Sequence, residues 1–272
     1  MSVPNESGGS YILATGDQAA ARLLLLERIF GTSTRSLLQA AGIMRGMKIA
    51  EIGCGSGLMT AWLAETVGPT GAVTAVDASD DQLRLAERNL QSSGLLNVSL
   101  HQAHAYQTGL PRESFDLLYS RFLMCHLSEP LKALLEMRAL LKPGGILVCE
   151  DHDDGGIFTV PQIHAYQRLV EISGALNQSK GLDSAIGLKL PSLLRACGFA
   201  GTNVWVQQHA FLRGEERRFW ELTLREAAPA VFAAGVATPE ELESICAEMR
   251  SIAEDESVLL LLARVTQVWV SK

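Results

Sequence analysis

The stretch KIAEIGCGSGLMTAWLAE, residues 48–65, places three glycines at alternate positions between a short apolar run and a helical pattern. Gly53 and Gly55 can adopt a positive φ and lack the Cβ that would block a ligand. Gly57 begins a helix, whose free N–H groups favour negative charge. A tight turn from strand to helix without a ligand is the alternative. Three alternating glycines behind the acid Glu51 favour a binding loop, so we predict a nucleotide-like ligand here.

The spacing of these glycines argues against a dinucleotide. The dinucleotide fingerprint is G-x-G-x-x-G, whereas here the third glycine comes one place early and Leu58 takes the last position. Glu51 also suits a cationic group better than two phosphates. Asp77 ends the next apolar run, 20 residues after Gly57. Its carboxylate can accept hydrogen bonds from both ribose hydroxyls, or it can cap the helix that follows, for which Ser79 already supplies a cap.

Strand-like and helical patterns alternate from residue 47 onward, which predicts a doubly wound α/β fold with a parallel sheet and helices on both faces. Ligands of such sheets bind at the carboxyl ends of the strands. The expected strands are KIAEI, AVTAVD, NVSLHQA, FDLLYS, GILVCED, TNVWVQQ and a closing VTQVWVSK. The expected helices between the first five strands are residues 58–67, 80–93 and 129–141.

The two ends of the chain depart from this alternation. Residues 17–30 and 34–41 form two helical patterns before the first strand, so we expect residues 1–46 to be a helical lid over the core at 47–272. Helical insertions are expected at about 157–198, with helices at 161–177 and from Pro191, and at about 213–263. The first ten residues have a composition typical of disorder.

The composition excludes several classes of protein. The chain has 272 residues, is 47% hydrophobic and contains no apolar run near the ~20 residues of a membrane span. With no secretory leader pattern, we expect a soluble, cytoplasmic protein without a membrane partner. Five scattered cysteines without a CxxC pair indicate reduced core thiols, and a net charge of −7 argues against a nucleic-acid partner. A homodimer is compatible with the sequence.

Four motifs, EIGCGSG, VTAVDAS, FDLLYSRFLMCHL and LKPGGILVCED, occur in an order and spacing that resemble the class I S-adenosylmethionine-dependent methyltransferases. The resemblance is to the small-molecule branch similar to ubiquinone and menaquinone biosynthesis methyltransferases, and it covers residues 47–151. It implies a Rossmann-like seven-stranded sheet with an antiparallel last strand, and S-adenosyl-L-methionine as cofactor. A nucleoside without phosphates explains both the close backbone approach at the glycines and the acid Glu51.

The resemblance also implies roles for single residues. Asp77 matches the ribose-binding acid, Ala78 the wall beneath the adenine, and Ala105 a backbone N–H donor to the adenine ring. His104 stands where many relatives have an acid that accepts from the adenine amino group, and a neutral imidazole can take that role. Tyr11 is the expected aromatic gate of the lid. The full set of expected cofactor contacts is Tyr11, Glu51, Gly53, Cys54, Gly55, Asp77, Ala78, Gln82, His104, Ala105, Ser120 and Arg121.

For catalysis the candidates are His126, Asp151 and His152, which follow the fourth and fifth expected strands. Each could position or deprotonate an acceptor, although positioning alone can supply most of the rate of methyl transfer. No metal is expected. The acceptor is a small molecule with an O, N or C atom to be methylated, and Ile157, Phe158, Tyr166, Phe219, Trp220 and Phe232 suit an apolar or aromatic one. The alternatives are an NAD-dependent oxidoreductase and a non-catalytic methyltransferase-like binding protein.

Overall fold

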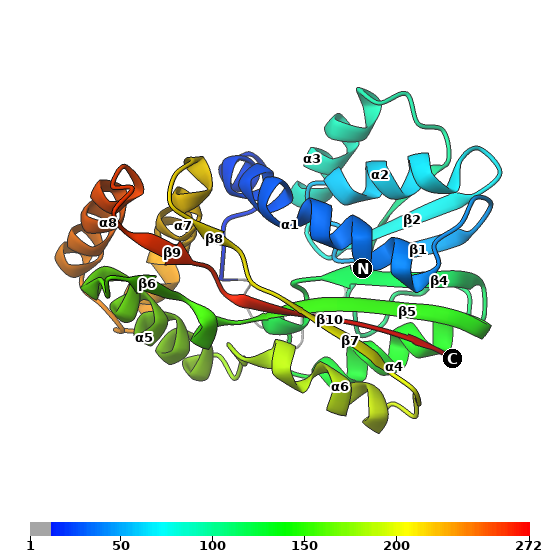
Figure 1. Cartoon of the computed structure of the whole chain (residues 1–272). Helices are drawn as coiled ribbons and strands as arrows, with labels where there is room; N and C mark the ends of the chain where they lie inside the picture. Colours follow the sequence, from blue (N-terminus) through cyan, green and yellow to red (C-terminus); the bar gives the residue numbers. More distant parts are fainter. Residues whose placement is uncertain (1–11) are drawn as a thin grey trace, which may run out of the picture.

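The computed structural model describes residues 12–272 (Figure 1). Tyr11, expected to gate the lid, and the first ten residues lie outside the described residues. Among the helices described, none is long and apolar enough to cross a membrane.

A seven-stranded sheet in the order β3-β2-β1-β4-β5-β10-β7 forms the centre of the molecule. Strands β1 to β5 pair in parallel, whereas β10 lies antiparallel between β5 and β7. The predicted α/β sheet with its antiparallel last strand is therefore confirmed. The strand bounds are β1 Lys48–Ile52, β2 Ala72–Asp77, β3 Val98–Gln102, β4 Phe115–Arg121, β5 Leu141–Asp153, β7 Asn203–Gln207 and β10 Arg264–Ser271.

Helices cover both faces of this sheet (Figure 1). One face packs against α1 (Ala20–Ala41) and α2 (Leu58–Val67), with Leu37, Leu38 and Leu63 fully buried between them and the strands. Helix α3 (Asp80–Gln91) packs on β2 on the same side. The other face packs against α4 (Pro130–Leu140) and α6 (Ile186–Ala196). The alternation of side chains along each strand thus divides the core into two layers.

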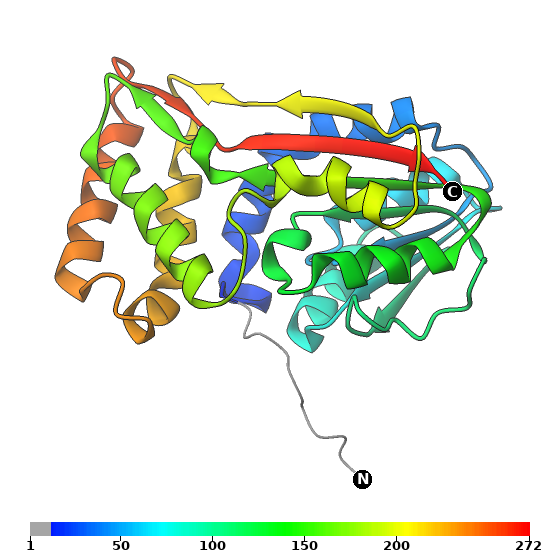
Figure 2. The same cartoon turned by 90° about the horizontal axis from the view of Figure 1, so that it is seen from below.

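A second, mainly helical region lies beyond the carboxyl ends of the strands (Figures 1 and 2). It contains α5 (His164–Ser179), α7 (Phe219–Ala233) and α8 (Pro239–Ala253), with one apolar core that also takes in Leu25, Ile29 and Phe30 of α1. A three-stranded sheet, β6-β9-β8, closes this region and was not predicted. Its strands are β6 Phe158–Val160, β8 Ala210–Phe211 and β9 Leu259–Leu261. The 3-10 turns among the described residues are η1 Gly16–Ala19, η2 Met124–His126, η3 Asp154–Gly156 and η4 Glu215–Arg218.

Two helix predictions were wrong in their bounds. The expected helices at 17–30 and 34–41 form one continuous helix, α1, because burial on both sides of Gly31 outweighs the weak helix propensity of the Gly-Thr-Ser stretch. The helix expected from Pro191 begins earlier, at Ile186, with Pro191 inside it. Burial of Ile186, Leu190 and Leu194 against the sheet holds this helix together despite the proline.

Candidate functional site

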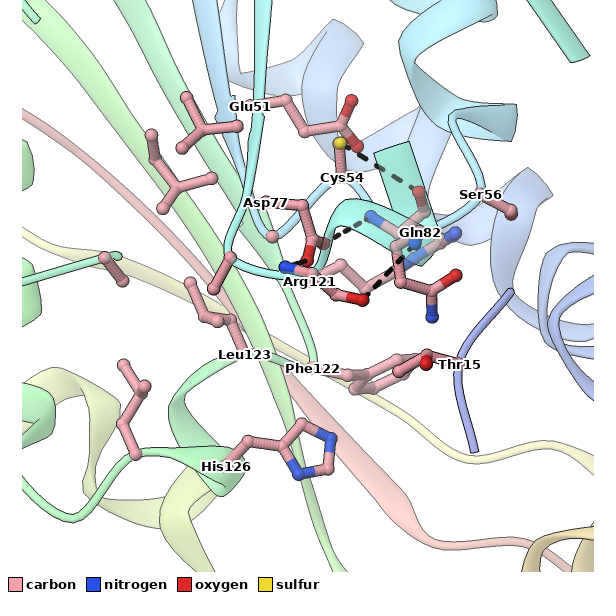
Figure 3. Close-up of a pocket in the computed structure, with 18 of the residues that line it drawn as sticks. Thr15, Glu51, Cys54, Ser56, Asp77, Gln82, Arg121, Phe122, Leu123 and His126 are labelled. Carbon is pink, nitrogen blue, oxygen red and sulfur yellow. Dashed lines mark hydrogen bonds between the residues drawn. The ribbon is translucent and has the colours of Figure 1, made fainter. Parts of the chain in front are cut away.

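A cavity of about 310 Å³ opens at the carboxyl ends of β1, β2 and β4. Figure 3 shows Glu51, Cys54 and Asp77 toward one end of it, and Phe122 and His126 at the other. The cavity size is in the range of small-molecule sites. Most of the expected cofactor contacts line it together: Glu51, Gly53, Cys54, Gly55, Asp77, Ala78, Gln82, His104, Ala105 and Arg121.

The three glycines of the loop after β1 all have positive φ, of 80°, 52° and 73°, but they serve different purposes. A Cβ on Gly53 would come within 3.1 Å of the Leu123 side chain. A Cβ on Gly55 would meet nothing within 4 Å, so this position faces the open cavity. A Cβ on Gly57 would lie 2.9 Å from the Ala86 Cβ, so this glycine lets α2 and α3 pack closely. The loop therefore needs glycine for folding and leaves room for a ligand at Gly55.

Asp77 and Gln82 present oxygen acceptors to this cavity. The Asp77 carboxylate accepts hydrogen bonds from the backbone N–H of Gly55 and of Ser79, each at 2.9 Å. Burial raises the pKa of Asp77, although these backbone hydrogen bonds oppose the rise. Gln82 is 4% exposed, and its Oε1 has no hydrogen-bond partner within the described structure. A buried acceptor without a partner beside an acid fits a ligand that brings hydroxyl or amino donors.

Glu51 lies deeper in the same wall, at 4% exposure, and accepts a hydrogen bond from the Thr60 hydroxyl. Burial raises its pKa to about 7, against the lowering effects of Thr60 and Arg121. Glu51 can thus switch between the neutral and the charged form near neutral pH. A nearby cationic group would favour the charged form, so the site fits a positively charged ligand at this end.

Arg121 lines the cavity but is already engaged. Its Nη2 lies 2.8 Å from Glu27 Oε2 of α1, and its Nη1 donates to the Thr34 hydroxyl at 3.3 Å. Burial would lower the pKa of Arg121, but Tyr119, Glu27 and Glu150 outweigh this effect and raise it. Arg121 is therefore a fixed cation whose charge is largely neutralised by α1.

The Thr34 hydroxyl also donates to Glu150 at 2.6 Å, and Glu150 accepts further bonds from Tyr119 and Gln267. This buried network fastens the second half of α1 to β4, β5 and β10. Of residues 12–41, only Ile12, Thr15, Arg22, Leu23 and Leu26 line the larger cavity. We therefore restrict the proposed lid to residues 12–26, since the rest of α1 belongs to the core.

Two predicted site residues lie away from the cavity. Ser120 is buried at 2% exposure, and its hydroxyl bonds to Cys149 Sγ at 3.3 Å on the face covered by α4 and α6. The reason is strand alternation: Tyr119 and Arg121 face α1, so Ser120 faces the other way. Asp151 lines neither cavity described here and accepts from the backbone N–H of Cys125 and His152, at 3.2 and 2.9 Å. The structure does not support the predicted cofactor contact of Ser120.

A second cavity of about 130 Å³ lies between the sheet and the helical region. Its wall is mostly apolar and comes from α1, α5 and α7 and from the segment after β4. His126 and Phe122 line both cavities. Phe122 has a φ of 50°, which is unusual for a bulky residue and marks the sharp turn at the end of β4. The two cavities therefore adjoin at this turn.

The histidines at the second cavity have opposite protonation behaviour. Burial lowers the pKa of His126 to about 4, so its imidazole is neutral at pH 7 and can accept a proton. Burial would also lower the pKa of His152, but Asp154 and the other neighbours raise it well above its usual value. The His152 ring lies 3.2 Å from Asp151 and 3.3 Å from Asp154. The prediction of His152 as a base is weakened, because its ring already carries the proton.

Cys125, Asp151 and His152 are also a group whose ligand-type atoms lie within 4.8 Å of one another. Asp151 and His152 are already paired, and the Cys125 thiol has its pKa raised to about 12 by burial. Asp153, the other acid of this turn, pairs with Arg264 instead. The absence of a metal stays a prediction.

Sequence reasoning missed Arg22 and Phe122, and it was only partly right about the aromatic residues. Phe219 and Trp220 line the second cavity, whereas Ile157 and Tyr166 are buried in the core and Phe158 and Phe232 are exposed. Arg22 is the one charge in the apolar run AARLLLL, but the run alone does not tell whether that charge is buried.

Part of the chain matches known proteins. Residues 50–149 match the family model described as "Methyltransferase domain". Demethylmenaquinone methyltransferase of Geobacillus stearothermophilus is 31% identical over 132 residues, which is 48% of this chain and 56% of that protein. Ubiquinone/menaquinone biosynthesis C-methyltransferase of Psychromonas ingrahamii is 36% identical over 115 residues, 42% of this chain and 46% of that protein. The chain thus spans about half the length of the curated relatives it matches.

Solved structures share the fold over a longer stretch. A putative methyltransferase from Bacillus halodurans superposes with a TM-score of 0.59 at 17% identity, covering 88% of this chain and 97% of that one. At this identity the likeness shows the fold alone. Together with the four motifs, the match shows a methyltransferase domain at residues 50–149 that is similar to those of the class I S-adenosylmethionine-dependent methyltransferases, and the cofactor that this domain indicates is S-adenosyl-L-methionine.

Proposed function

We propose that the chain transfers the methyl group of S-adenosylmethionine to a small-molecule acceptor held in the smaller cavity. The observation that carries the proposal is the junction of the two cavities at Phe122 and His126. The larger cavity has the glycine loop, the acids Glu51 and Asp77, and the unpaired acceptor Oε1 of Gln82. These groups suit an adenosine with a cationic end. The other is apolar and suits an organic molecule.

On this proposal Asp77 binds the ribose of the cofactor, and the cofactor passes close to the backbone at Gly55. Gln82 and the segment at His104 and Ala105 complete the binding site. Glu51 favours the cationic end of the ligand. When bound, the cofactor supplies an activated methyl group on a sulfonium. The chain's own contribution is then to align the acceptor with that group and to exclude water, since positioning can supply most of the rate.

His126 is the proposed proton acceptor wherever the acceptor loses a proton. Its neutral imidazole lies where the two cavities meet and can take a strongly acidic proton, because a pKa of about 4 makes it a weaker base than an ordinary histidine. His152 and Asp151 are proposed to position the turn after β4 instead, because they bind each other and the Cys125 backbone. The atom that receives the methyl group stays open between O, N and C.

The acceptors named for the relatives do not carry over to this chain. The family match ends at residue 149, whereas α5 and α7 of the smaller cavity come later in the chain. An NAD-dependent oxidoreductase finds no support among the methyltransferases compared above. We further propose a cytoplasmic protein, because its five cysteines are free and buried, as is usual in a reducing compartment. Neither nucleic acid nor a membrane is proposed as a partner, and a homodimer stays a proposal.

The test measures cofactor binding and methyl transfer separately. Asp77→Ala should weaken adenosylhomocysteine binding by about 1.5–3 kcal/mol, the range for hydrogen bonds to a charged group, as measured by titration calorimetry. The matched control is Asp81→Ala, an acid of the same region whose side chain is 60% exposed, and it should bind normally. Unchanged affinity in a folded Asp77→Ala would refute the ribose role. Methyl transfer from labelled cofactor into any metabolite of a cell extract would exclude the non-catalytic alternative.

A further inference from the structure

The strand β7 forms one edge of the seven-stranded sheet (Figure 2). Among the described strands it pairs only with β10, so one row of its backbone N–H and C=O groups has no neighbouring strand. Val204, Trp205 and Val206 are 45%, 39% and 58% exposed, although valine and tryptophan suit a half-buried position in a sheet. The outer side of β7 therefore resembles an inner strand that lacks one neighbour.

Edge strands of soluble proteins usually carry a device that prevents pairing with another chain. The common devices are a charged side chain, a proline or a bulge. Residues 201–212, GTNVWVQQHAFL, contain no Asp, Glu, Lys, Arg or Pro. The pairing of β7 with β10 also runs without a bulge from Asn203 to Gln207. This edge is thus open to pairing, and its lack of charge lets two copies of a chain of net charge −7 approach each other here.

Exposed apolar side chains lie on both faces of β7. Val204 stands opposite Val268 of β10, which belongs to the core under α4 and α6, so Val204 and Val206 lie on that face. Trp205 lies on the other face, where its ring packs edge-on against Trp269 of β10, with 5.0 Å between the ring centroids. A further strand at this edge would cover apolar side chains on both faces of the sheet.

The sequence of β7, Asn-Val-Trp-Val-Gln, reads nearly the same in both directions. If two copies of β7 pair antiparallel with Trp205 opposite Trp205, Val204 of each strand meets Val206 of the other, and Asn203 meets Gln207. Cross-strand pairs of matching side chains stabilise antiparallel strands. The backbone groups of successive residues alternate between the two sides of a strand, so this register pairs the outward-pointing groups with one another in either phase.

We propose that β7 is the interface of a homodimer, in which two copies join edge to edge about a two-fold axis at Trp205 and form one continuous sheet. Such an interface is isologous: both copies use the same strand, so the dimer closes and leaves neither β7 edge free. A strand of another protein could pair with the backbone, but it would not account for the symmetric order of side chains. The proposal concerns assembly and does not depend on the reaction of the chain.

The test is sedimentation velocity of the full chain at a series of micromolar concentrations. We expect the wild type to form a dimer. Val206→Lys should raise the dissociation constant at least about tenfold, since it changes two cross-strand pairs per dimer. The added lysine brings the negative net charge closer to zero, so general charge repulsion between the chains does not explain such a loss. A wild type that stays monomeric overturns the proposal.

The matched control is Leu96→Lys, which adds the same charge at a side chain that is 99% exposed. Leu96 lies just before β3, at the opposite edge of the sheet, so this variant should dimerise like the wild type. Val204→Lys should act like Val206→Lys and replaces it if that variant does not fold. Equal weakening by Leu96→Lys, or no weakening by the lysine on β7, overturns the proposal.

A cysteine cross-link tests the register. Trp205→Cys places the new thiols of the two copies on directly opposed residues, whose Cα atoms are about 4.5–5.5 Å apart, a separation that suits a disulfide. Asn203→Cys leaves the two new thiols four residues out of register, about 14 Å apart. We expect covalent dimers under mild oxidation from Trp205→Cys and none from Asn203→Cys. The wild type, whose five native cysteines are buried, is the blank. Any other pattern overturns the register and with it the proposal.

Discussion

The larger and the smaller cavity differ in how they are built. The larger one is lined mainly by short segments after β1, β2 and β4, each of which carries its functional residue next to a strand end. The smaller one is lined mainly by single residues of three helices, α1, α5 and α7, brought together only by packing. A site made of strand ends has a local sequence pattern because the turn itself demands particular residues. A site between helices has none, since its residues follow the same spacing as any buried helix face.

This comparison predicts that the glycine loop is sensitive to folding as well as to binding. Gly57→Ala should lower the free energy of unfolding by about 2–5 kcal/mol, because alanine at positive φ costs about 1–2 kcal/mol and overpacking about 1–3 kcal/mol. The clash arises because the new Cβ would lie 2.9 Å from the Ala86 Cβ. Urea unfolding measures the change.

Gly94→Ala is the matched control for this prediction. Gly94 has a φ of 65°, but a Cβ there meets nothing within 4 Å. Only the conformational cost of about 1–2 kcal/mol should remain. Equal losses in the two variants would mean that helix packing contributes nothing and that Gly57 is needed only for the turn.

The two ends of the larger cavity should respond to pH with opposite signs. Glu51 has a folded pKa of about 7 against an ordinary 4.5, so folding favours its protonated form. The contribution of Glu51 to the free energy of unfolding is largest below pH 4.5 and is lost as the pH rises through 7. His126 has a folded pKa of about 4 against 6.5, so folding favours its neutral form. Its contribution is present above pH 6.5 and is lost as the pH falls toward 4.

Each effect amounts to about 3 kcal/mol, since one pKa unit corresponds to about 1.4 kcal/mol. The measurement is the free energy of unfolding of the wild type relative to Glu51→Gln and to His126→Gln between pH 4 and 8. Relative to Glu51→Gln the wild type should gain stability as the pH falls. Relative to His126→Gln it should lose stability. Slopes of the same sign would contradict the protonation states assigned to the site.

The sequence predicted the seven-stranded sheet and most of the larger cavity, partly from local patterns and partly from the resemblance to the methyltransferase family. β1, β2 and α2 have the expected bounds, since each is delimited by glycine, proline or a polar residue. Ser120 was misplaced because side chains alternate along β4, and the position of Ser120 near the end of the strand does not reveal that its side chain lies on the face opposite Tyr119 and Arg121. Arg22 was missed because a single arginine in a helix does not reveal whether it is exposed.

The small sheet β6-β9-β8 could not be predicted for a similar reason. Its strands have only two or three residues, too few to establish a period. They pair across long sequence separations, and β9 follows directly after a helical block. Only the tertiary fold brings them together.

The smallest expected effect is a difference in amide exchange between the two halves of α1. The first half lies at the cavities, whereas the second half belongs to the core. Amide exchange of residues 12–26 should slow by about tenfold, equivalent to about 1.4 kcal/mol, when adenosylhomocysteine is added, because several of these residues line the cavity. Residues 34–41 should not respond, since Thr34 is tied to Glu150 and Leu37 and Leu38 are fully buried on the sheet. Thr34→Val removes the tie and should extend the ligand response into this second half. Equal exchange of residues 12–26 with and without ligand would make the whole helix a permanent part of the core and would leave the cavity without a lid.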